Sequence, residues 1–382
     1  MMGFVHLVAL AILVAILVRE VGAADSNAGG AGTAAHRMCT AFEPQVGVWS
    51  VDPDAAARGE TTHAALHSEL FRNKTYDYAY RSVPYRDFAD CPEPYKWQFQ
   101  PNKGTCHVPL WEEQRLQFLQ QLSGKTVVFA GDSLVRQLYT GMRNKLIMDS
   151  SIARGDDRLE VVSVGRWHPA CYPKWTAGKT NEAETSQFRS SFGTIRLRFF
   201  PVYSELYYAH SFAGNSSWLD TADVLIVNVG AFAHAKEPLE VALQKWVESL
   251  EAYIARRTRP PLRVIWKEYT PAHFPALVRP PADAPGEPIW PIPQEMHQKI
   301  VEDRLECSTA GISLQDARAG QFRLSLLDTV LSDRERRRVE SNATRSEPWE
   351  VFRLFDAMWE RADGHIGLQA KGLGELHAAC IE

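Results

Sequence analysis

The sequence lacks the marks of several common protein classes. Its charge is nearly balanced, with 42 Lys and Arg residues against 46 Asp and Glu residues and a formal net charge of −4. Nucleic-acid-binding proteins usually carry a basic field, so this balance argues against a nucleic-acid partner. No two cysteines have the close Cys-x-x-Cys spacing of a zinc site, and we expect no metal. No internal repeat is visible, and 382 residues that are 45% hydrophobic and 23% charged suit one large globular domain or two small ones.

The apolar run at the N-terminus is short for a membrane span. It covers residues 4–18, with His6 as its polar interruption, whereas a spanning helix needs about 20 residues. The length fits the core of a secretory signal peptide, and Val21-Gly22-Ala23 supplies small residues for cleavage. No positive charge precedes the run, so an uncleaved signal anchor that holds the protein to a membrane is the alternative. Residues 1–24 are therefore interpreted as a signal peptide or signal anchor.

Cysteines and glycosylation sequons favour the secretory route as well. An even number of cysteines suits an oxidising compartment, and six allow fifteen pairings among which the sequence does not choose. Three Asn-x-Ser/Thr sequons are acceptors for N-glycans in such a compartment. The cysteines are Cys39, Cys91, Cys106, Cys171, Cys307 and Cys380, and the sequon asparagines are Asn73, Asn215 and Asn342.

The remaining chain divides into three parts. Residues 25–38 are small, polar and rich in Gly and Ala, which is typical of a flexible linker. Residues 39–110 are rich in aromatics, Pro and Cys without a clear period, which indicates a cysteine-rich N-terminal subdomain. Residues 111–382 form the predicted catalytic domain. Within it, residues 271–293 hold eight prolines and are interpreted as a surface loop near the active face.

Apolar runs alternate with helical patterns along the catalytic domain. Strands alternating with helices predict an α/β fold, with a mainly parallel sheet and helices on both faces. The charged block 334–338 is interpreted as a solvated helix face. Strands are predicted over residues 126–130, 159–164, 194–200, 224–227, 262–266 and 351–355, and helices over 111–122, 239–256, 300–305 and 331–339, besides the helix that follows Ser133.

A serine stands where the first of these strands turns into a helix. Residues 127–130 are apolar, Gly131-Asp132-Ser133 breaks the run, and Leu134, Leu138 and Met142 recur at helical spacing. A serine there lies at the carboxyl end of a strand and near a helix N-terminus, where backbone N–H groups can face an oxyanion. An ordinary helix N-cap is the alternative. Asn228 and Gly230 also follow a predicted strand, at the edge where parallel sheets bind ligands.

Six motifs in order resemble the plant trichome-birefringence-like proteins. This family is the polysaccharide O-acetyltransferase branch of the GDSL/SGNH hydrolase superfamily, and the resemblance covers about residues 39–382. The motifs are Cys39 with Gly47-Val48-Trp49, Trp97-Gln98-Phe99-Gln100-Pro101 with Cys106-His107-Val108-Pro109, the stretch 118–136 with Gly131-Asp132-Ser133, the strand 223–230, Thr270-Pro271-Ala272-His273-Phe274, and Leu354-Phe355-Asp356 with Arg361-Ala362-Asp363-Gly364-His365.

The resemblance implies a fold, a reaction and a compartment. The fold would be an SGNH-hydrolase-like three-layer α/β/α sandwich with the cysteine-rich subdomain packed on it. The reaction would be acetyl transfer, through an acyl-serine, to hydroxyls of a cell-wall polysaccharide in the Golgi lumen. No bound cofactor is implied, but an acetyl donor of unknown identity is required. The partners would be that donor and the polysaccharide acceptor.

Acyl transfer needs a nucleophile, a base, a group that orients the base, and donors for the oxyanion. Ser133 is the predicted nucleophile. Its own N–H and the Asn228 side chain, with a Gly230 N–H, are the predicted oxyanion hole, although Asn228 also suits a strand-end turn. Arg136 is a candidate for steering an anionic donor or faces solvent. Trp167, Trp175 and Tyr203 are candidates for a sugar groove, with the core as their alternative.

The C-terminus departs from the family pattern. The family ends in Asp-Cys-x-His-Trp-Cys, whereas this chain has Gly374 at the Asp position and Glu375 beside it. The family register makes His377 the base, with Glu375 or Asp363 as the orienting acid. His365 is the competing base because Asp363 is close to it. A dyad or a catalytically weak protein are further readings, since losing the orienting acid costs several orders of magnitude in rate.

Two rival functions follow from the same residues. An acetyl esterase would use the same site with water as acceptor. A lectin-like or structural cell-wall protein with a decayed triad is the non-catalytic rival. The motif layout also suggests the pairing Cys39–Cys106 and Cys91–Cys380, the second of which would hold His377 near the site, and this leaves Cys171 with Cys307.

Overall fold

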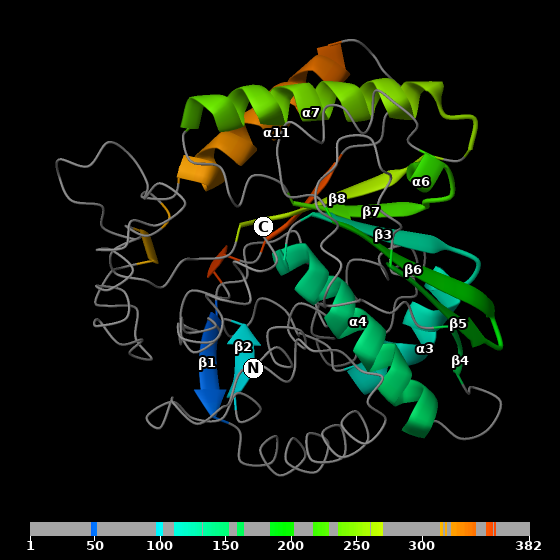
Figure 1. Cartoon of the computed structure of the whole chain (residues 1–382). Helices are drawn as coiled ribbons and strands as arrows, with labels where there is room; N and C mark the ends of the chain where they lie inside the picture. Colours follow the sequence, from blue (N-terminus) through cyan, green and yellow to red (C-terminus); the bar gives the residue numbers. More distant parts are fainter. Residues whose placement is uncertain are drawn as a thin grey trace, which may run out of the picture.

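A seven-stranded sheet forms the centre of the molecule (Figure 1). The computed structural model describes residues 47–51, 97–101, 111–131, 133–152, 159–163, 184–201, 217–228, 236–259, 261–269, 314–315, 318, 322–340, 349–353 and 355–356. The strand order is β4-β5-β6-β3-β7-β8-β9. The strands are β4 (Glu160–Ser163), β5 (Glu184–Ser190), β6 (Gly193–Pro201), β3 (Thr126–Gly131), β7 (Val224–Val227), β8 (Arg263–Lys267) and β9 (Glu350–Phe352).

The sheet is mostly parallel. Strands β6, β3, β7, β8 and β9 run parallel to one another, while β5 forms an antiparallel hairpin with β6 and β4 pairs antiparallel with β5 at the edge. The predicted α/β class with a mainly parallel sheet is therefore confirmed. Such sheets need crossover helices, because a parallel neighbour cannot be reached by a tight hairpin.

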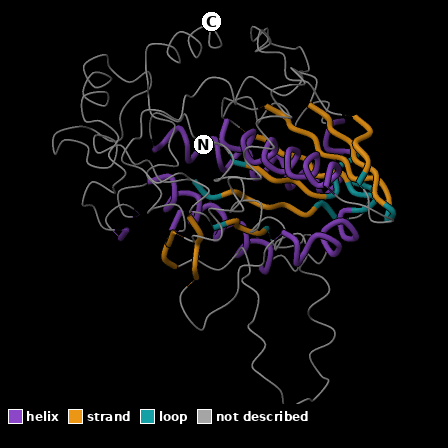
Figure 2. The backbone as a smooth tube through the Cα atoms, turned by 90° about the horizontal axis from the view of Figure 1, so that it is seen from below, coloured by secondary structure: helices purple, strands orange, loops and turns teal. Residues whose placement is uncertain are grey.

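Helices cover both faces of the sheet. Helices α3 (Trp111–Leu122) and α4 (Ser133–Ile152) pack on one face, and α7 (Lys236–Arg256) and α11 (Phe322–Glu340) on the other. Side chains alternate between the two layers, as a strand requires. In β3, Val127 and Phe129 belong to the α3/α4 layer, while Val128 and Ala130 belong to the α7/α11 layer. Figure 2, which views the molecule from below, shows helices in front of the side-by-side strands.

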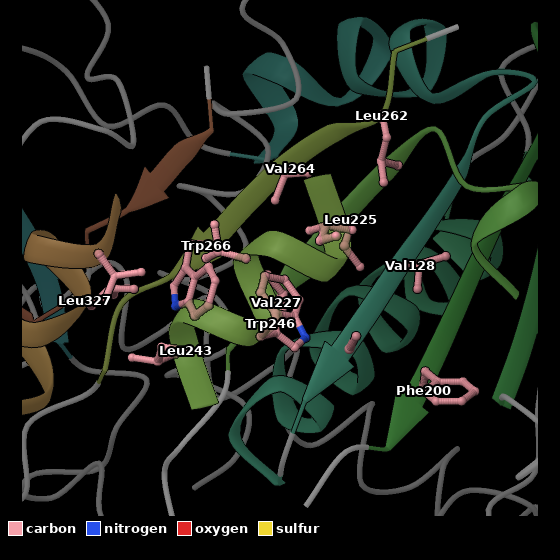
Figure 3. Packing of buried hydrophobic residues seen from close by; sticks show 14 of the residues in the cluster. Val128, Phe200, Leu225, Val227, Leu243, Trp246, Leu262, Val264, Trp266 and Leu327 are labelled. Carbon is pink, nitrogen blue, oxygen red and sulfur yellow. The ribbon is translucent and has the colours of Figure 1, made fainter. Parts of the chain in front are cut away.

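Two tryptophans pack among the aliphatic side chains of the α7/α11 layer (Figure 3). Trp246 of α7 meets Trp266 of β8 edge to face, with ring centroids 4.9 Å apart, and both are almost fully buried.

The charged block 334–338 differs from the prediction at its first residue. Arg334 is 1% exposed and lies over the Trp349 ring, while its Nε donates to Glu251 at 2.9 Å. Burial lowers the pKa of the Arg334 guanidinium, and the Glu251 carboxylate opposes that effect.

The predicted and observed elements agree closely where runs are apolar. The helix at 111–122 and the strand at 224–227 have the predicted bounds. Strand β5 and the short helix α6 (Ser217–Asp220) were not predicted, and α11 begins nine residues before the predicted 331. The apolar run 4–18, the Pro-rich segment 271–293 and the helix at 300–305 lie outside the described residues. Among the helices that are described, none has the length and apolarity to cross a membrane.

The N-terminal region contributes a small antiparallel pair. Strand β1 (Gly47–Val51) pairs with β2 (Trp97–Pro101), so that Trp49 lies opposite Phe99. Sequence reasoning expected no regular structure here. The six cysteines and three sequon asparagines lie outside the described residues, so the predicted subdomain and its disulfides stay predictions.

Tyr253 provides a first test of the packing between α6 and α7. Its hydroxyl donates to Asp220 Oδ1 at 2.8 Å, and burial, followed by this carboxylate, raises its pKa. We expect Tyr253→Phe to lower the free energy of unfolding by about 1 kcal/mol at pH 7. Above a pH of about 10, the unfolded tyrosine ionises while the folded one keeps its proton, so wild-type stability falls relative to the variant. Urea unfolding of both proteins from pH 7 to 11 checks this, and a difference that stays constant with pH would contradict it.

Candidate active site at the carboxyl edge of the sheet

The predicted serine lies at the turn between the central strand and its helix. Strand β3 ends at Gly131, and α4 begins at Ser133. The first turn of α4 holds no acidic side chain. The first N–H groups of a helix have no partner within the helix and carry the positive end of its dipole, so they favour a negative charge at this point. The backbone therefore fits the predicted setting of a nucleophile with an oxyanion beside it.

Gly131 makes this turn possible. A Cβ atom added to it would lie 2.5 Å from Val135 Cγ2 and 2.7 Å from the backbone carbonyl oxygen of Asn228. Real Cβ atoms do not approach other atoms so closely, and a backbone oxygen cannot move aside as a flexible side chain can. The absence of a side chain thus lets β3, the start of α4 and the end of β7 meet at one point.

We expect Gly131→Ala to destabilise the protein by about 2 kcal/mol, as overpacking of a filled core does. It should also displace Ser133 from Asn228 and lower reactivity of the serine more than stability alone explains. Thermal unfolding measures the first effect, and the rate of labelling by a fluorophosphonate measures the second. Gly124→Ala is a useful comparison, because it has open space around the added atom, although its backbone also has a positive φ of 74°. Equal labelling of the Gly131 variant and the wild type would contradict the close-approach argument.

Asn228 lies beside this turn, as predicted. It is fully buried, and its backbone N–H donates to the carbonyl oxygen of Ala130 at 3.3 Å. Its side-chain Nδ2 donates to the carbonyl oxygen of Lys267 at 2.8 Å. An amide has two N–H bonds, so a role in an oxyanion hole would use the second hydrogen of Nδ2. The bond to Lys267 fixes the amide plane and joins the ends of β7 and β8, so Asn228 has a structural role here besides the predicted one.

The strand register shows where the sheet changes from apolar to polar. Phe129, Ile226 and Ile265 form one row across β3, β7 and β8, and all three are fully buried against the α3/α4 layer. Two residues further along each strand, Gly131, Asn228 and Lys267 stand in the corresponding places. Residues two apart share a face. The polar groups therefore begin at the carboxyl edge.

Sequence reasoning missed Lys267 and Glu268. Lys267 is 3% exposed, and its Nζ donates to the carbonyl oxygen of Glu268 at 3.1 Å. In the sequence, these two charged residues directly follow an apolar strand, at the same edge of the sheet as Asn228, and this position was a signal for a functional role. Neither residue stands in a motif with a recognised spacing, so no role in the site was predicted for them.

Glu268 joins β8 to the chain beyond β9. It has no exposed surface, and its Oε2 accepts from the Phe355 backbone N–H at 2.8 Å. Its Oε1 accepts from Arg353 Nη1 at 3.1 Å and from Arg318 Nη2 at 3.4 Å. Arg318 also pairs with Asp356. One buried carboxylate therefore ties together the carboxyl ends of two strands and two arginines.

The other predicted site residues cannot be placed. The side chains of Ser133 and Arg136 lie outside the described part of the chain, although the backbone of both belongs to α4. Also outside it lie Gly230, Trp167, Trp175, Tyr203, Asp363, His365, Glu375 and His377. The structure thus brings Ser133 and Asn228 to one edge, and the base and its acid stay predictions. Within the described ranges, no three His, Cys, Asp or Glu side chains gather as metal ligands would.

The carboxyl edge as a whole can support chemistry on an anionic species. It joins a helix N-terminus, a buried amide and a buried ammonium within three adjacent strands. Groups of this kind stabilise charge that develops in a transition state. Comparison with known proteins identifies no relative, because no family model, no curated protein and no solved structure matches the chain.

Proposed function

We propose that the protein is a polysaccharide O-acetyltransferase that works through an acyl-serine at Ser133. The observation that supports this proposal is the turn at Gly131, which packs the strand end just before Ser133 against the backbone of Asn228 at the carboxyl edge of the central parallel strands. The six motifs that resemble the trichome-birefringence-like family support the same reading. On this proposal the sheet and its helices are an SGNH-like sandwich, and the protein acts in the Golgi lumen.

The reaction would run in two half-steps. Ser133 Oγ attacks the carbonyl carbon of an acetyl ester or thioester, and its proton passes to the base. The donor's leaving group then departs with that proton, which leaves acetyl-serine. A sugar hydroxyl attacks the same carbon and gives its proton to the base, and Ser133 leaves and takes the proton back. Each attack creates an oxyanion, which the N–H groups at the start of α4 and Asn228 would stabilise.

The base belongs to the part of the proposal that rests on sequence. His377 holds the family register, with Glu375 or Asp363 to orient it, and His365 is the competing base. Acyl transfer needs such a base because a serine hydroxyl is a weak nucleophile at neutral pH.

Transfer and hydrolysis share the acyl-serine and differ in the acceptor. The test is to incubate the full-length, secreted protein with p-nitrophenyl acetate as donor and a panel of cell-wall polysaccharides. We expect acetyl groups to appear on one polysaccharide, and a fluorophosphonate that reacts with Ser133 to block their transfer. Release of acetate with every acceptor would make the protein an esterase. No turnover and no labelling of folded protein would contradict both enzymatic readings and favour a non-catalytic cell-wall protein.

A further inference from the structure

The β5–β6 hairpin carries a polar face on the side of the sheet that α7 and α11 cover further along. In β6, Ile195, Leu197 and Phe199 are buried in the α3/α4 layer, so the residues between them point to the opposite side. In Figure 1, α7 and α11 lie over β7 and β8, while β5 and β4 form the other end of the sheet. We call the six polar positions of the hairpin on this side the arginine face, which consists of Thr185, Gln187, Arg189, Thr194, Arg196 and Arg198.

The arginines of this face stand opposite neutral residues. The cross-strand pairs are Arg189 with Thr194, Arg196 with Gln187, and Arg198 with Thr185. Strands gain stability from opposite charges placed across from each other and lose it from like charges held close. Arg196 is a diagonal neighbour of Arg189 and lies two residues from Arg198 along β6, so both Cα atoms are about 7 Å away. Pairing within the hairpin alone does not favour three cations at these places.

Water reaches the arginine face. Arg196 is exposed, and the Arg189 side chain is 58% exposed. Arg189 pairs with Glu160 of β4 at 3.0 Å, and this pair is weak because the Glu160 side chain is 60% exposed as well. Arg198 is half-buried and donates to Thr221 Oγ1 at 3.2 Å. Among the described side chains, the hairpin and β4 thus place three guanidinium groups and a single carboxylate on this side.

The neighbouring turn between α6 and β7 is balanced in charge. Arg257 and Arg259 donate to the backbone carbonyl oxygens of Ala222 and Asp220, and the side chains of Asp220 and Asp223 belong to the same turn. Two cations and two carboxylates offset each other there. The excess of positive charge therefore belongs to the arginine face, in a chain whose net charge is −4.

The arginine face leads toward the edge where the predicted nucleophile lies. Strand β6 runs parallel to β3, with Arg198 opposite Val128 and Pro201 opposite Gly131. The three residues from Arg198 to Pro201 span about 10 Å. Helix α4 begins at Ser133, two residues after Gly131. An extended polymer laid along β6 therefore continues to the carboxyl edge.

We infer that the arginine face binds an acidic polysaccharide through the carboxylates of its uronic acids. A guanidinium group binds a carboxylate through two parallel hydrogen bonds. The Thr and Gln side chains between the arginines offer donors and acceptors to sugar hydroxyls. None of the six positions holds an aromatic ring, on which the bases of a single-stranded nucleic acid would stack. The inference rests on the proposed function where it names this polymer as the acceptor, one sugar of which reaches Ser133.

The test measures binding and needs no turnover. The full-length, secreted protein is titrated calorimetrically with polygalacturonate, a polymer of uronic acids, and with a neutral mannan at low ionic strength. We expect the acidic polymer to bind about tenfold more tightly or better, and its affinity to fall as salt screens the charges. Arg189→Gln together with Arg196→Gln should raise the Kd for polygalacturonate about tenfold, because each exposed ion pair contributes about threefold.

Arg336→Gln together with Arg337→Gln on α11 is the matched control. It removes the same charge from exposed positions, and Arg336, like Arg189, belongs to an exposed pair, here with Asp333. The control should keep the wild-type Kd. Arg196→Lys retains the positive charge and should bind within about threefold of the wild type. Thermal unfolding shows which variants are folded, and Arg196→Gln alone, with an expected loss of about threefold, replaces the double variant if that one does not fold.

Three results would overturn the inference. They are equal affinity for the acidic and the neutral polymer, an equal loss of affinity in the control and in the hairpin variant, and tighter binding of single-stranded DNA than of polygalacturonate at the same concentration of charge. Lack of Ser133-dependent acetyl transfer would instead refute the proposed function and the role of the polymer as acceptor, while the binding result would still decide what the arginine face holds.

Discussion

Ser133→Ala is expected to abolish acetyl transfer and ester hydrolysis. Removing a nucleophile leaves the binding and oxyanion contributions, so kcat should fall by on the order of 10⁴-fold or more. Stability should change little, because the serine is the first residue of α4 and the loss of a helix cap costs about 1 kcal/mol. Steady-state turnover and fluorophosphonate labelling measure the effect, and thermal unfolding shows that the variant is folded.

Ser123→Ala is a matched control for this prediction. Ser123 lies just before β3, where its hydroxyl donates to the backbone carbonyl oxygen of Phe192, far from the carboxyl edge. Its replacement should cost at most about 1 kcal/mol of stability and leave turnover unchanged. Near-normal turnover of Ser133→Ala would exclude the acyl-serine mechanism, whatever the behaviour of the control.

Glu268→Gln is expected to lower the free energy of unfolding more than any of the other substitutions. The carboxylate of Glu268 accepts three hydrogen bonds, from two arginines and from the buried Phe355 N–H. A glutamine of the same shape brings an NH₂ group against these donors and removes the negative charge. Arg318 and Arg353 keep their second partners, Asp356 and Asp328, but the buried Phe355 N–H then faces an NH₂ group and the network loses its central charge. Breaking a buried pair from one side costs about 3 kcal/mol. Urea unfolding at pH 7 measures the change.

Asp333→Asn is the surface counterpart. Asp333 pairs with Arg336 one turn away at 2.8 Å, and the two side chains are 45% and 66% exposed. Exposed pairs contribute little, because water and salt screen them, so this variant should be nearly as stable as the wild type. If both variants lose the same small amount of stability, Glu268 is not the tie between β8 and β9 that its contacts indicate.

The sequence predicts elements best where one physical signal dominates. Residues 224–227 are apolar on both faces and were predicted without error, because a central parallel strand is buried on both sides. Strand β5 was missed because its buried positions include Ser186 and Ser190 beside Phe188, so its alternation has a weak hydrophobic signal. Strand β5 forms because it pairs with β6, whose apolar run is visible in the sequence.

The residues of the candidate site show the same difference between local and distant signals. The place of Ser133 and Asn228 at the carboxyl edge was predicted, because the end of a strand is a local signal. The partners of Glu268 are 50 and 85 residues away in the sequence, at Arg318 and Arg353, so no local pattern connects them. The buried state of Lys267 depends likewise on what packs over the end of β8. Charged residues after an apolar strand read as solvated in sequence, and tertiary packing makes them part of the interior.

The order of strands in the sheet has a consequence for biosynthesis. Of the seven strands in the central sheet, the apolar strand β3 leaves the ribosome first, but its neighbours are β6, about 70 residues later, and β7, about 100 residues later. At the usual speed of translation it stays unpaired for on the order of 10 s. The far edge closes still later, when Glu350 reaches Ile265. The nascent chain therefore exposes this apolar strand while about 70 to 100 further residues are made, and we expect its yield to depend on chaperones that shield β3 until its neighbours are available.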